Sequence, residues 1–286
     1  MLTALIDGDL ISYPCAAASE NDPEDIAILR AYDVISRLLD NIVPDNYRVF
    51  LGHKVNFRKT LSPDYKANRT TPAPKHRNAI NEYLFNEHKA ESLMGAEADD
   101  LLGMNQKQDG STIIASYDKD LLQVPGKHYN WHRDVFTDMD HYTASYHFYS
   151  QLLIGDPSDN VKGVLGIGKK KAEKILYGLT EEEMFDKCRE LYDDDERFLL
   201  SGRLLWIWKS PYDVWSPTSL TSTENFKLDL DSVFGSTTKT QEESAPLLEA
   251  TTSQKTMSGT LQDGISLDTS HTLQEKQMPE PNAALT

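Results

Sequence analysis

Carboxylates recur in four short segments of this 286-residue chain. They follow the run "LTALID", fill "GAEADDLLG", follow "TIIAS" and stand three apart in "IGDPSDN". The acids are Asp7, Asp9, Glu97, Asp99, Asp100, Asp118, Asp120, Asp156 and Asp159. Ionised carboxylates gathered in one place repel one another unless a cation neutralises them. Hard divalent ions such as Mg²⁺ and Mn²⁺ prefer carboxylate oxygens, so the pattern predicts a metal pocket.

Two divalent ions held among carboxylates are a recurrent solution for phosphodiester hydrolysis, because they activate water and stabilise charge on the phosphate and the leaving oxygen. Each acid alone has a plainer explanation, since aspartate often caps a helix N-terminus. Asp99 or Asp100 can cap the helix that begins at "LLGM", and Asp118 can cap the turn "KDLLQ". The four clusters taken together favour the metal pocket.

Positive charge gathers in residues 54–77, where Lys and Arg stand with Asp64 as the sole acid and with two interleaved aromatic residues. Cations contact phosphates and rings stack on bases, so this composition indicates nucleic-acid binding. The alternative is a solvated, flexible basic loop. A helix that begins near Asp64 is expected to place Lys66 and Arg69 on one face and to present Tyr65 for stacking on a terminal base.

A second basic segment covers residues 158–176, "SDNVKGVLGIGKKKAEKIL". Gly166 and Gly168 let a backbone approach closely, and Lys169 and Lys170 follow at the start of an expected helix whose N-terminus attracts anions. The pattern indicates a helix–hairpin–helix clamp for phosphates. A nucleotide-binding loop is disfavoured, because no strand precedes the segment and no Gly-Lys-Ser/Thr is present.

The formal net charge of −16 taken alone argues against a nucleic-acid partner. The charge is unevenly distributed, however, with two local basic surfaces beside one acidic pocket whose charge bound cations would reduce. The total therefore leaves DNA open as a partner.

An α/β body is expected to position these groups. "LTALID", "YRVFLG" and "TIIAS" read as buried strands, with helical spacing between them in "EDIAILRAYDVISRLLDNI" and from "EADDLLGM" onward. Alternating strands and helices predict a parallel sheet covered on both faces, at whose carboxyl edge ligands bind. From Ala144 onward the pattern is wholly helical.

Three regions follow from these patterns: an α/β core over 1–143 that includes a basic region at about 54–90, a helical region over 144–217, and a tail over 218–286. The tail is rich in Ser, Thr, Gln and Glu, and its composition predicts an acidic disordered segment. A short docking helix around 228–234 is the alternative.

The cellular compartment can be inferred from the cysteines and from the scarcity of long apolar segments. Cys15 and Cys188 stand far apart without zinc-like spacing, which indicates a reducing compartment. The N-terminus has neither a basic start nor a long apolar run, and no stretch is apolar enough to span a membrane. A monomeric, cytoplasmic protein is expected.

In its motifs the chain resembles the 5′-nuclease or flap endonuclease superfamily, and most closely the 5′→3′ exonucleases of T-odd coliphages. The resemblance runs in order through "DGDL", "FRKTLSPDYKANR", "GAEADD", "SYDKDLLQ", "GDPSDN" and "GVLGIGKKKA" and covers about residues 1–217. It implies a PIN-like core with a helical arch and a helix–hairpin–helix region, and it implies activity on duplex DNA with 5′ ends or flaps.

The resemblance also implies roles for single residues. The metal ligands would be Asp7, Glu97, Asp99, Asp100, Asp118, Asp120, Asp156 and Asp159, holding two or more ions. Lys66 and Arg69 would contact the scissile phosphate beside Tyr65, while Gly166, Gly168, Lys169 and Lys170 would bind the duplex and can also hold K⁺. His53 departs from the many relatives that carry Asp there, and Asp9 is an additional acid of the phage branch.

Three functions fit these features. The first is a DNA 5′→3′ exonuclease with flap endonuclease activity, which can extend to RNA in RNA–DNA hybrids. The second is a PIN-type ribonuclease, against which the helix–hairpin–helix speaks. The third is a non-catalytic DNA-binding homologue, against which the four intact acidic clusters speak.

Overall fold

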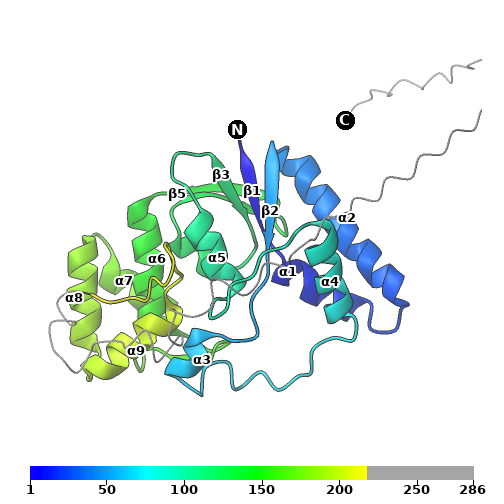
Figure 1. Ribbon diagram of the computed structural model, residues 1–286. Helices are drawn as coiled ribbons and strands as arrows, with labels where there is room; N and C mark the ends of the chain where they lie inside the picture. Colours follow the sequence, from blue (N-terminus) through cyan, green and yellow to red (C-terminus); the bar gives the residue numbers. More distant parts are fainter. Residues whose placement is uncertain (218–286) are drawn as a thin grey trace, which may run out of the picture. The chain divides into compact units, whose positions relative to one another are not determined.

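A five-stranded sheet forms the centre of the computed structural model, which describes residues 1–217 (Figure 1). The strand order is β2-β1-β3-β4-β5, and all neighbours are parallel except β4 and β5. The strands are β1 Thr3–Asp7, β2 Asn46–Phe50, β3 Thr112–Ala115, β4 Gly126–Asn130 and β5 Val135–Met139. The expected mostly parallel α/β sheet is confirmed. The β4–β5 hairpin was not predicted, and the expected tail lies outside the described residues.

Helices flank this sheet. They are α1 Asp9–Ala18, α2 Glu24–Ile42, α3 Phe57–Leu61, α4 Arg77–Glu87, α5 Ala98–Asn105, η1 Asp120–Gln123, α6 His141–Ile154, α7 Lys169–Leu176, α8 Glu181–Leu191 and α9 Asp195–Leu205. In Figure 1, α1, α2 and α4 lie together on one side and α6 to α9 on the other. No helix within residues 1–217 is long and apolar enough to cross a lipid bilayer.

The alternation of side chains along β1 explains the two layers. Ala4 and Ile6 point into a core shared with α1, α2 and α4, whereas Leu5 points into a second core with α5. Asp7 has the parity of Leu5 and therefore leaves the sheet on the α5 side. This places its carboxylate toward the acids at the start of α5.

The sequence predicted a wholly helical region from Ala144 onward, and the structure shows that this is wrong. A small antiparallel pair, β6 Gly155–Asp156 and β7 Val161–Lys162, interrupts it. Gly155 has a φ of 77°, and a Cβ there would lie 2.3 Å from the backbone nitrogen of Gly163. The turn "GDPSDN" thus needs glycine at 155, and the pair fixes Asp156 within a strand.

The basic segment crosses the molecule between the two groups of helices, running from α3 to α4 along the bottom of Figure 1. It contains no continuous helix, and Pro72 and Pro74 within it lack the backbone N–H that a helix interior needs. The expected helix from Asp64 is wrong. The backbone makes successive turns instead, with Ala67 N bonded to Asp64 O and Arg69 N bonded to Lys66 O, both at 3.1 Å.

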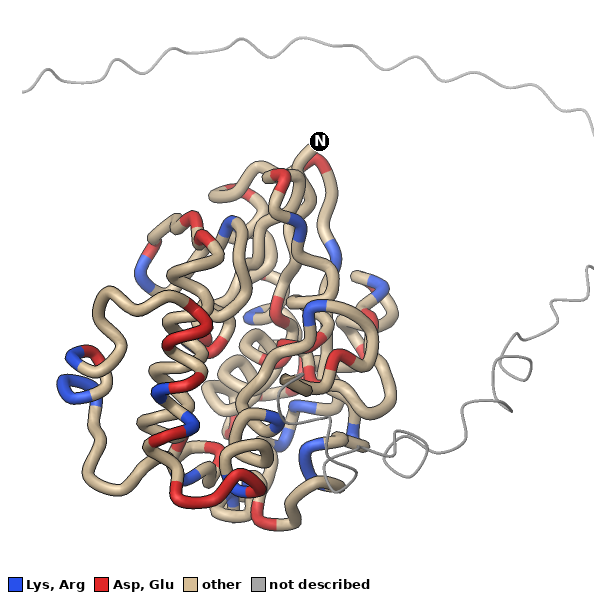
Figure 2. The backbone as a smooth tube through the Cα atoms, turned by 90° about the vertical axis from the view of Figure 1, so that its left-hand side faces the viewer, with Lys and Arg blue, Asp and Glu red and all other residues tan. Residues whose placement is uncertain are grey.

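Basic and acidic residues are both distributed over the described backbone rather than gathered in one region (Figure 2). Any basic surface of the described residues is therefore local, and the contacts of individual side chains must define it.

Candidate active site

The carboxyl edge of the sheet brings two acidic clusters together. Asp7 ends β1, and Asp118 follows the neighbouring strand β3. Asp7 is 2 % exposed. Its carboxylate accepts hydrogen bonds from the backbone N of Leu10 at 3.1 Å and from Oγ of Ser116 at 2.9 Å. Ser116 Oγ also accepts from the backbone N of Asp118 at 3.1 Å, which ties the two strand ends into one site.

Repulsion within this cluster shows how close its acids lie. Burial, together with the charges of Asp9 and Asp118, raises the pKa of Asp7 from 3.8 to about 7. Burial and the charges of Asp118 and Asp7 raise the pKa of Asp99 well above its usual value. A nearby cation stabilises the ionised form of such carboxyl groups most, because it offsets their mutual repulsion.

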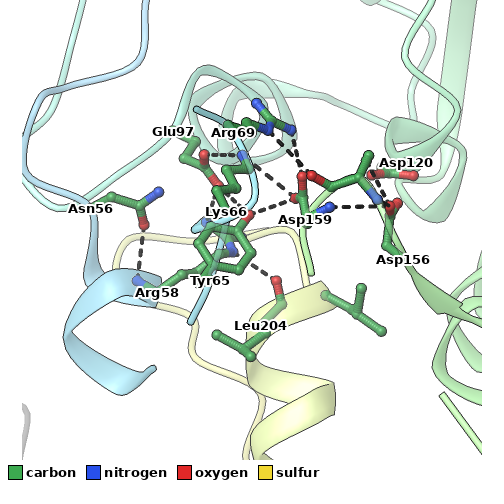
Figure 3. Close-up of polar contacts among 12 residues, drawn as sticks. Asn56, Arg58, Tyr65, Lys66, Arg69, Glu97, Asp120, Asp156, Asp159 and Leu204 are labelled. Atoms are coloured by element: carbon green, nitrogen blue, oxygen red, sulfur yellow. Dashed lines mark hydrogen bonds and ion pairs between the residues drawn. The ribbon is translucent and has the colours of Figure 1, made fainter. Parts of the chain in front are cut away.

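A second cluster joins the basic segment to two other acids (Figure 3). The Lys66 ammonium is hydrogen-bonded to Glu97 and lies 3.5 Å from Asp159. Arg69 donates to Asp159 at 2.5 Å, and the Tyr65 hydroxyl lies 2.8 Å from both carboxylates. Although burial works to raise it, the pKa of Glu97 falls to about 2 because the guanidinium of Arg58 and the ammonium of Lys66 face this carboxylate.

Lys66 adopts a left-handed backbone conformation, with a φ of 56°. Such a conformation costs a non-glycine residue on the order of 1–2 kcal/mol, so the surrounding contacts must hold it. The backbone N of Lys66 donates to the backbone O of Asp159 at 2.9 Å, which anchors the turn to the "GDPSDN" segment. Lys66 and Arg69 therefore converge on Asp159 without a helix.

The expectation that Tyr65 stacks on a base is not met in this conformation. Its ring is 3 % exposed and packs in the apolar cluster that includes Phe148 and Leu152. Its hydroxyl orients Glu97 and Asp159 instead. Tyr65 thus packs in the core and positions two candidate ligands through its hydroxyl.

A third cluster pairs the acids Asp120 and Asp156 through one lysine. The Lys119 ammonium lies 2.7 Å from Asp120 and 2.9 Å from Asp156. Burial and the neighbouring charge of Asp118 raise the pKa of Asp120 to about 6. Burial also opposes ionisation of Asp156, but hydrogen bonds from Ser158 and Lys119 lower its pKa to about 2. Lys119 was not singled out from the sequence, although it stands between two predicted ligands.

Asp100 was expected to be a metal ligand, but its carboxylate is wholly taken up by the protein. It is fully buried and accepts from both terminal nitrogens of Arg58 at 2.7 Å, and from the backbone nitrogens of Glu97 and Trp208 at 3.0 and 3.2 Å. Arg58 also donates to the carbonyl oxygens of Leu204 and Trp206. In the sequence, Arg58 stands out only as one of the basic residues of 54–77. The buried pair of Arg58 and Asp100 is a structural element of the site.

Two further residues singled out from the sequence have local partners. Asp9 accepts from the backbone N of Gly52 at 3.0 Å and from Arg77 at 3.2 Å, which links α1 to the end of β2 and to α4. His53 Nδ1 accepts from the backbone N of Val55 at 3.1 Å, within the loop after β2. Both lie beside the acidic edge, and their present contacts stabilise the loop there.

The segment from Gly166 to Lys170 is open on its outer side. Gly166 has a φ of 77°, and no atom lies within 4 Å of a Cβ added there or at Gly168. Ile167 is buried and anchors the turn, while the neighbouring Leu165 is 97 % exposed. Lys169 and Lys170 are exposed in the first turn of α7. This geometry leaves room for another chain against the backbone.

The donor set fits a hard divalent cation, because it offers carboxylate oxygens that repel one another at Asp7, Asp99, Asp118 and Asp120. Within residues 1–217, no three acidic, histidine or cysteine side chains are arranged closely enough to enclose an ion. Two pairs of acids are bridged by a lysine: Lys66 lies between Glu97 and Asp159, and Lys119 lies between Asp120 and Asp156. The residues thus suit metal by chemistry, with side-chain rotation needed to form a closed shell.

Comparison with known proteins places the chain in a family. Residues 3–149 match the model of the 5′-3′ exonuclease N-terminal resolvase-like domain. Flap endonuclease Xni of Shewanella baltica is 29% identical over 45% of this chain and 55% of its own length. A 5′-3′ exonuclease of Buchnera aphidicola is 27% identical over 68% of this chain and 74% of its own length. The fold resembles that of the T5 D15 protein co-crystallized with metal ions, from bacteriophage T5, with a TM-score of 0.52, 17% identity and coverage of 72% of this chain and 86% of that one. The chain therefore belongs to the family of the 5′-3′ exonuclease N-terminal resolvase-like domain.

Proposed function

We propose that this chain is a divalent-metal-dependent DNA 5′→3′ exonuclease and flap endonuclease. The observation that carries the proposal is the meeting of Lys66 and Arg69 with Glu97 and Asp159, because it joins phosphate-binding cations to candidate metal ligands from two distant segments. Its curated relatives are named as enzymes of this kind.

The chain's own residues divide the work around a scissile phosphate. Asp7, Glu97, Asp99, Asp118, Asp120, Asp156 and Asp159 are the carboxylates that would hold two or more Mg²⁺ or Mn²⁺ ions. When bound, such ions supply a hydroxide from water and stabilise charge on the phosphate. Lys66 and Arg69 approach the same phosphate from the basic segment and stabilise charge that grows in the transition state.

The duplex portion of the DNA binds at the segment 163–172 in this proposal, as a helix–hairpin–helix. The open backbone at Gly166 and Gly168 and the exposed ammonium groups of Lys169 and Lys170 support this placement. Carbonyl oxygens of the same turn would take K⁺. The protein acts as a monomer on duplex DNA with 5′ ends or flaps, in the cytoplasm.

A digest of four 5′-labelled substrates tests the proposal: a DNA flap, an all-RNA flap, a blunt DNA duplex and a single strand, each with Mg²⁺ and with a chelator. We expect cleavage at the flap junction and short products from the 5′ end, both lost on chelation. Asp118→Asn serves as the inactive control. Binding without cleavage in Mg²⁺ would identify a non-catalytic homologue, and cleavage confined to an all-RNA flap would identify a ribonuclease.

A further inference from the structure

The turn between β4 and β5 lies at the same edge of the sheet as the candidate metal ligands. Because β4 is parallel to β3, the carboxyl ends of both strands meet there. In the strand order β2-β1-β3-β4-β5, the basic segment follows β2 on one side and this turn follows β4 on the other. Asp7 and Asp118 extend from the strands between them.

The turn carries rings and a cation in succession: Trp131, His132 and Arg133. The Tyr117 ring contacts the rings of Trp131 and His132, with centroids 5.0 and 5.6 Å apart. Tyr117 directly precedes Asp118. The cluster of Tyr117, Trp131 and His132, called here the ring cluster, therefore begins one residue from a candidate metal ligand.

The backbone of this turn is well fixed. The side chain of Asn130 accepts from the backbone nitrogens of His132 and Arg133, both at 3.1 Å, and Asp134 accepts from the Tyr129 hydroxyl at 2.9 Å. A turn held in this way presents its side chains at low entropic cost when a ligand binds.

Arg133 brings an available charge. Its side chain is exposed and forms no ion pair with a carboxylate of residues 1–217, whereas Arg58 and Arg69 of the basic segment are both paired. An unpaired guanidinium beside rings matches the needs of a nucleotide, because the cation takes the phosphate and a ring takes the base.

Two hollows open on either side of Tyr117 and His132. One, of about 350 Å³, lies between Leu10, Leu38 and Trp131, and the other, of about 320 Å³, reaches Asp118 and Arg133. Both volumes are within the range of small-molecule sites, of roughly 300–1,000 Å³. There is thus room for one base on the apolar side of the ring cluster, with its phosphate toward Arg133.

We infer that the β4–β5 turn is a third DNA contact, which holds an unpaired nucleotide next to the scissile phosphate, its base on the ring cluster and its phosphate on Arg133. The inference rests on the proposed function and adds a site to it. It also adds rings that are less buried than Tyr65, since Tyr117 and Trp131 are half-buried, Trp131 against the core, and His132 is exposed.

Binding in Ca²⁺ tests the inference without requiring cleavage. A 5′-flap substrate with 2-aminopurine at the first unpaired position and a fully paired duplex are titrated with the wild type and with Trp131→Leu/Arg133→Ala. We expect the double variant to bind the flap about tenfold or more weakly and the duplex within twofold, because stacking one base is worth about 1–3 kcal/mol. Arg133→Ala alone should reduce the salt slope for the flap by about 1.

Lys127→Ala is the matched control, because Lys127 is an exposed cation on β4 at the opposite edge of the sheet. It should bind both substrates as the wild type does. Trp131→Phe keeps a ring and should retain most of the flap affinity, which separates stacking from damage to the fold.

The inference is overturned if the double variant binds the flap within twofold of the wild type, or if it loses flap and duplex affinity equally. Absence of cleavage by the wild type in Mg²⁺ would instead count against the proposed function. The binding results in Ca²⁺ would still test the contact at the β4–β5 turn, because they do not depend on cleavage.

Discussion

Arg58 and Asp100 form a bidentate ion pair in the core, each terminal guanidinium nitrogen 2.7 Å from a carboxylate oxygen. Their side chains are 3% and 0% exposed. The pair fastens α3, at the base of the basic segment, to the helix that carries Glu97 and Asp99. The pair gives Asp100 a surrounding unlike that of its neighbour Asp99, which faces the charges of Asp118 and Asp7.

Asp100→Asn is expected to destabilise the fold rather than to impair chemistry alone. Breaking a buried pair leaves an uncompensated charge, which typically costs about 3–5 kcal/mol. Urea unfolding measures this loss. The matched control is Asp99→Asn, which removes a repelled charge and should leave the free energy of unfolding unchanged or higher while cleavage is lost. Equal stability of Asp100→Asn and the wild type would show that the pair contributes little.

Lys66→Ala is expected to slow single-turnover cleavage by roughly 10²-fold or more, in the range for losing one electrostatic donor. The dissociation constant in Ca²⁺ should change only several-fold, since a group that acts on the transition state affects rate more than binding. Lys66→Arg should restore part of the rate, because the guanidinium differs in shape and hydration from an ammonium.

Lys59→Ala and Lys75→Ala are the controls for Lys66, because both residues are exposed in the same basic segment and neither forms an ion pair within residues 1–217. They should act on binding only. Equal effects of all three variants, confined to binding, would reduce Lys66 to one charge among several.

Stability in a chelator is expected to depend on pH through the repelled acids. Burial and neighbouring charges raise the pKa of Asp7 to about 7 and that of Asp120 to about 6. Their protonated forms favour the folded state, so this stability is complete below about pH 4 and is lost as the pH rises toward 7. Thermal unfolding from pH 4 to 8 should show the decline, and Asp7→Asn should flatten it.

Glu97 and Asp156 change stability with pH in the opposite direction. Their pKa values are lowered to about 2, so the stability that they provide is present above about pH 4 and lost as the pH falls toward 2. The combined contribution of these four acids to stability without metal is therefore greatest near pH 4 to 5. Added Mg²⁺ should raise the melting temperature most near pH 7. A profile that is flat from pH 4 to 7 in the chelator would contradict the mutual repulsion of the acids.

Lys169→Ala/Lys170→Ala is expected to weaken duplex binding and to reduce its salt slope by about 2, since each phosphate contact contributes about 1. Lys174→Ala is the control, because Lys174 lies in the last turn of the same helix. A double variant with an unchanged slope would place the duplex elsewhere.

The placement of Asp7 and Asp118 at the carboxyl edge of the sheet was predictable from the sequence because its determinants are local. A strand that ends in an acid puts that acid at the carboxyl edge of a parallel sheet wherever the strand lies in the order, and this applies to Asp7 and to Asp118 after "TIIAS". The apolar periodicity of α2 and the interruption by Pro72 and Pro74 are likewise properties of neighbouring residues. The family resemblance came from the order of such segments along the chain.

What only the tertiary structure decided depends on partners far apart in sequence. Asp99 and Asp100 are adjacent and alike in type, and only the approach of Arg58 and of the backbone N of Trp208 makes one of them structural. Tyr65 is buried because α6 packs over it, and Lys66 reaches Asp159 through a left-handed turn held by a contact 93 positions away (159 − 66). The β4–β5 turn lies at the carboxyl edge of the parallel strands because β4 pairs with β3 in parallel. Composition and periodicity record neighbours along the chain, whereas these contacts are set by packing between segments that periodicity does not relate.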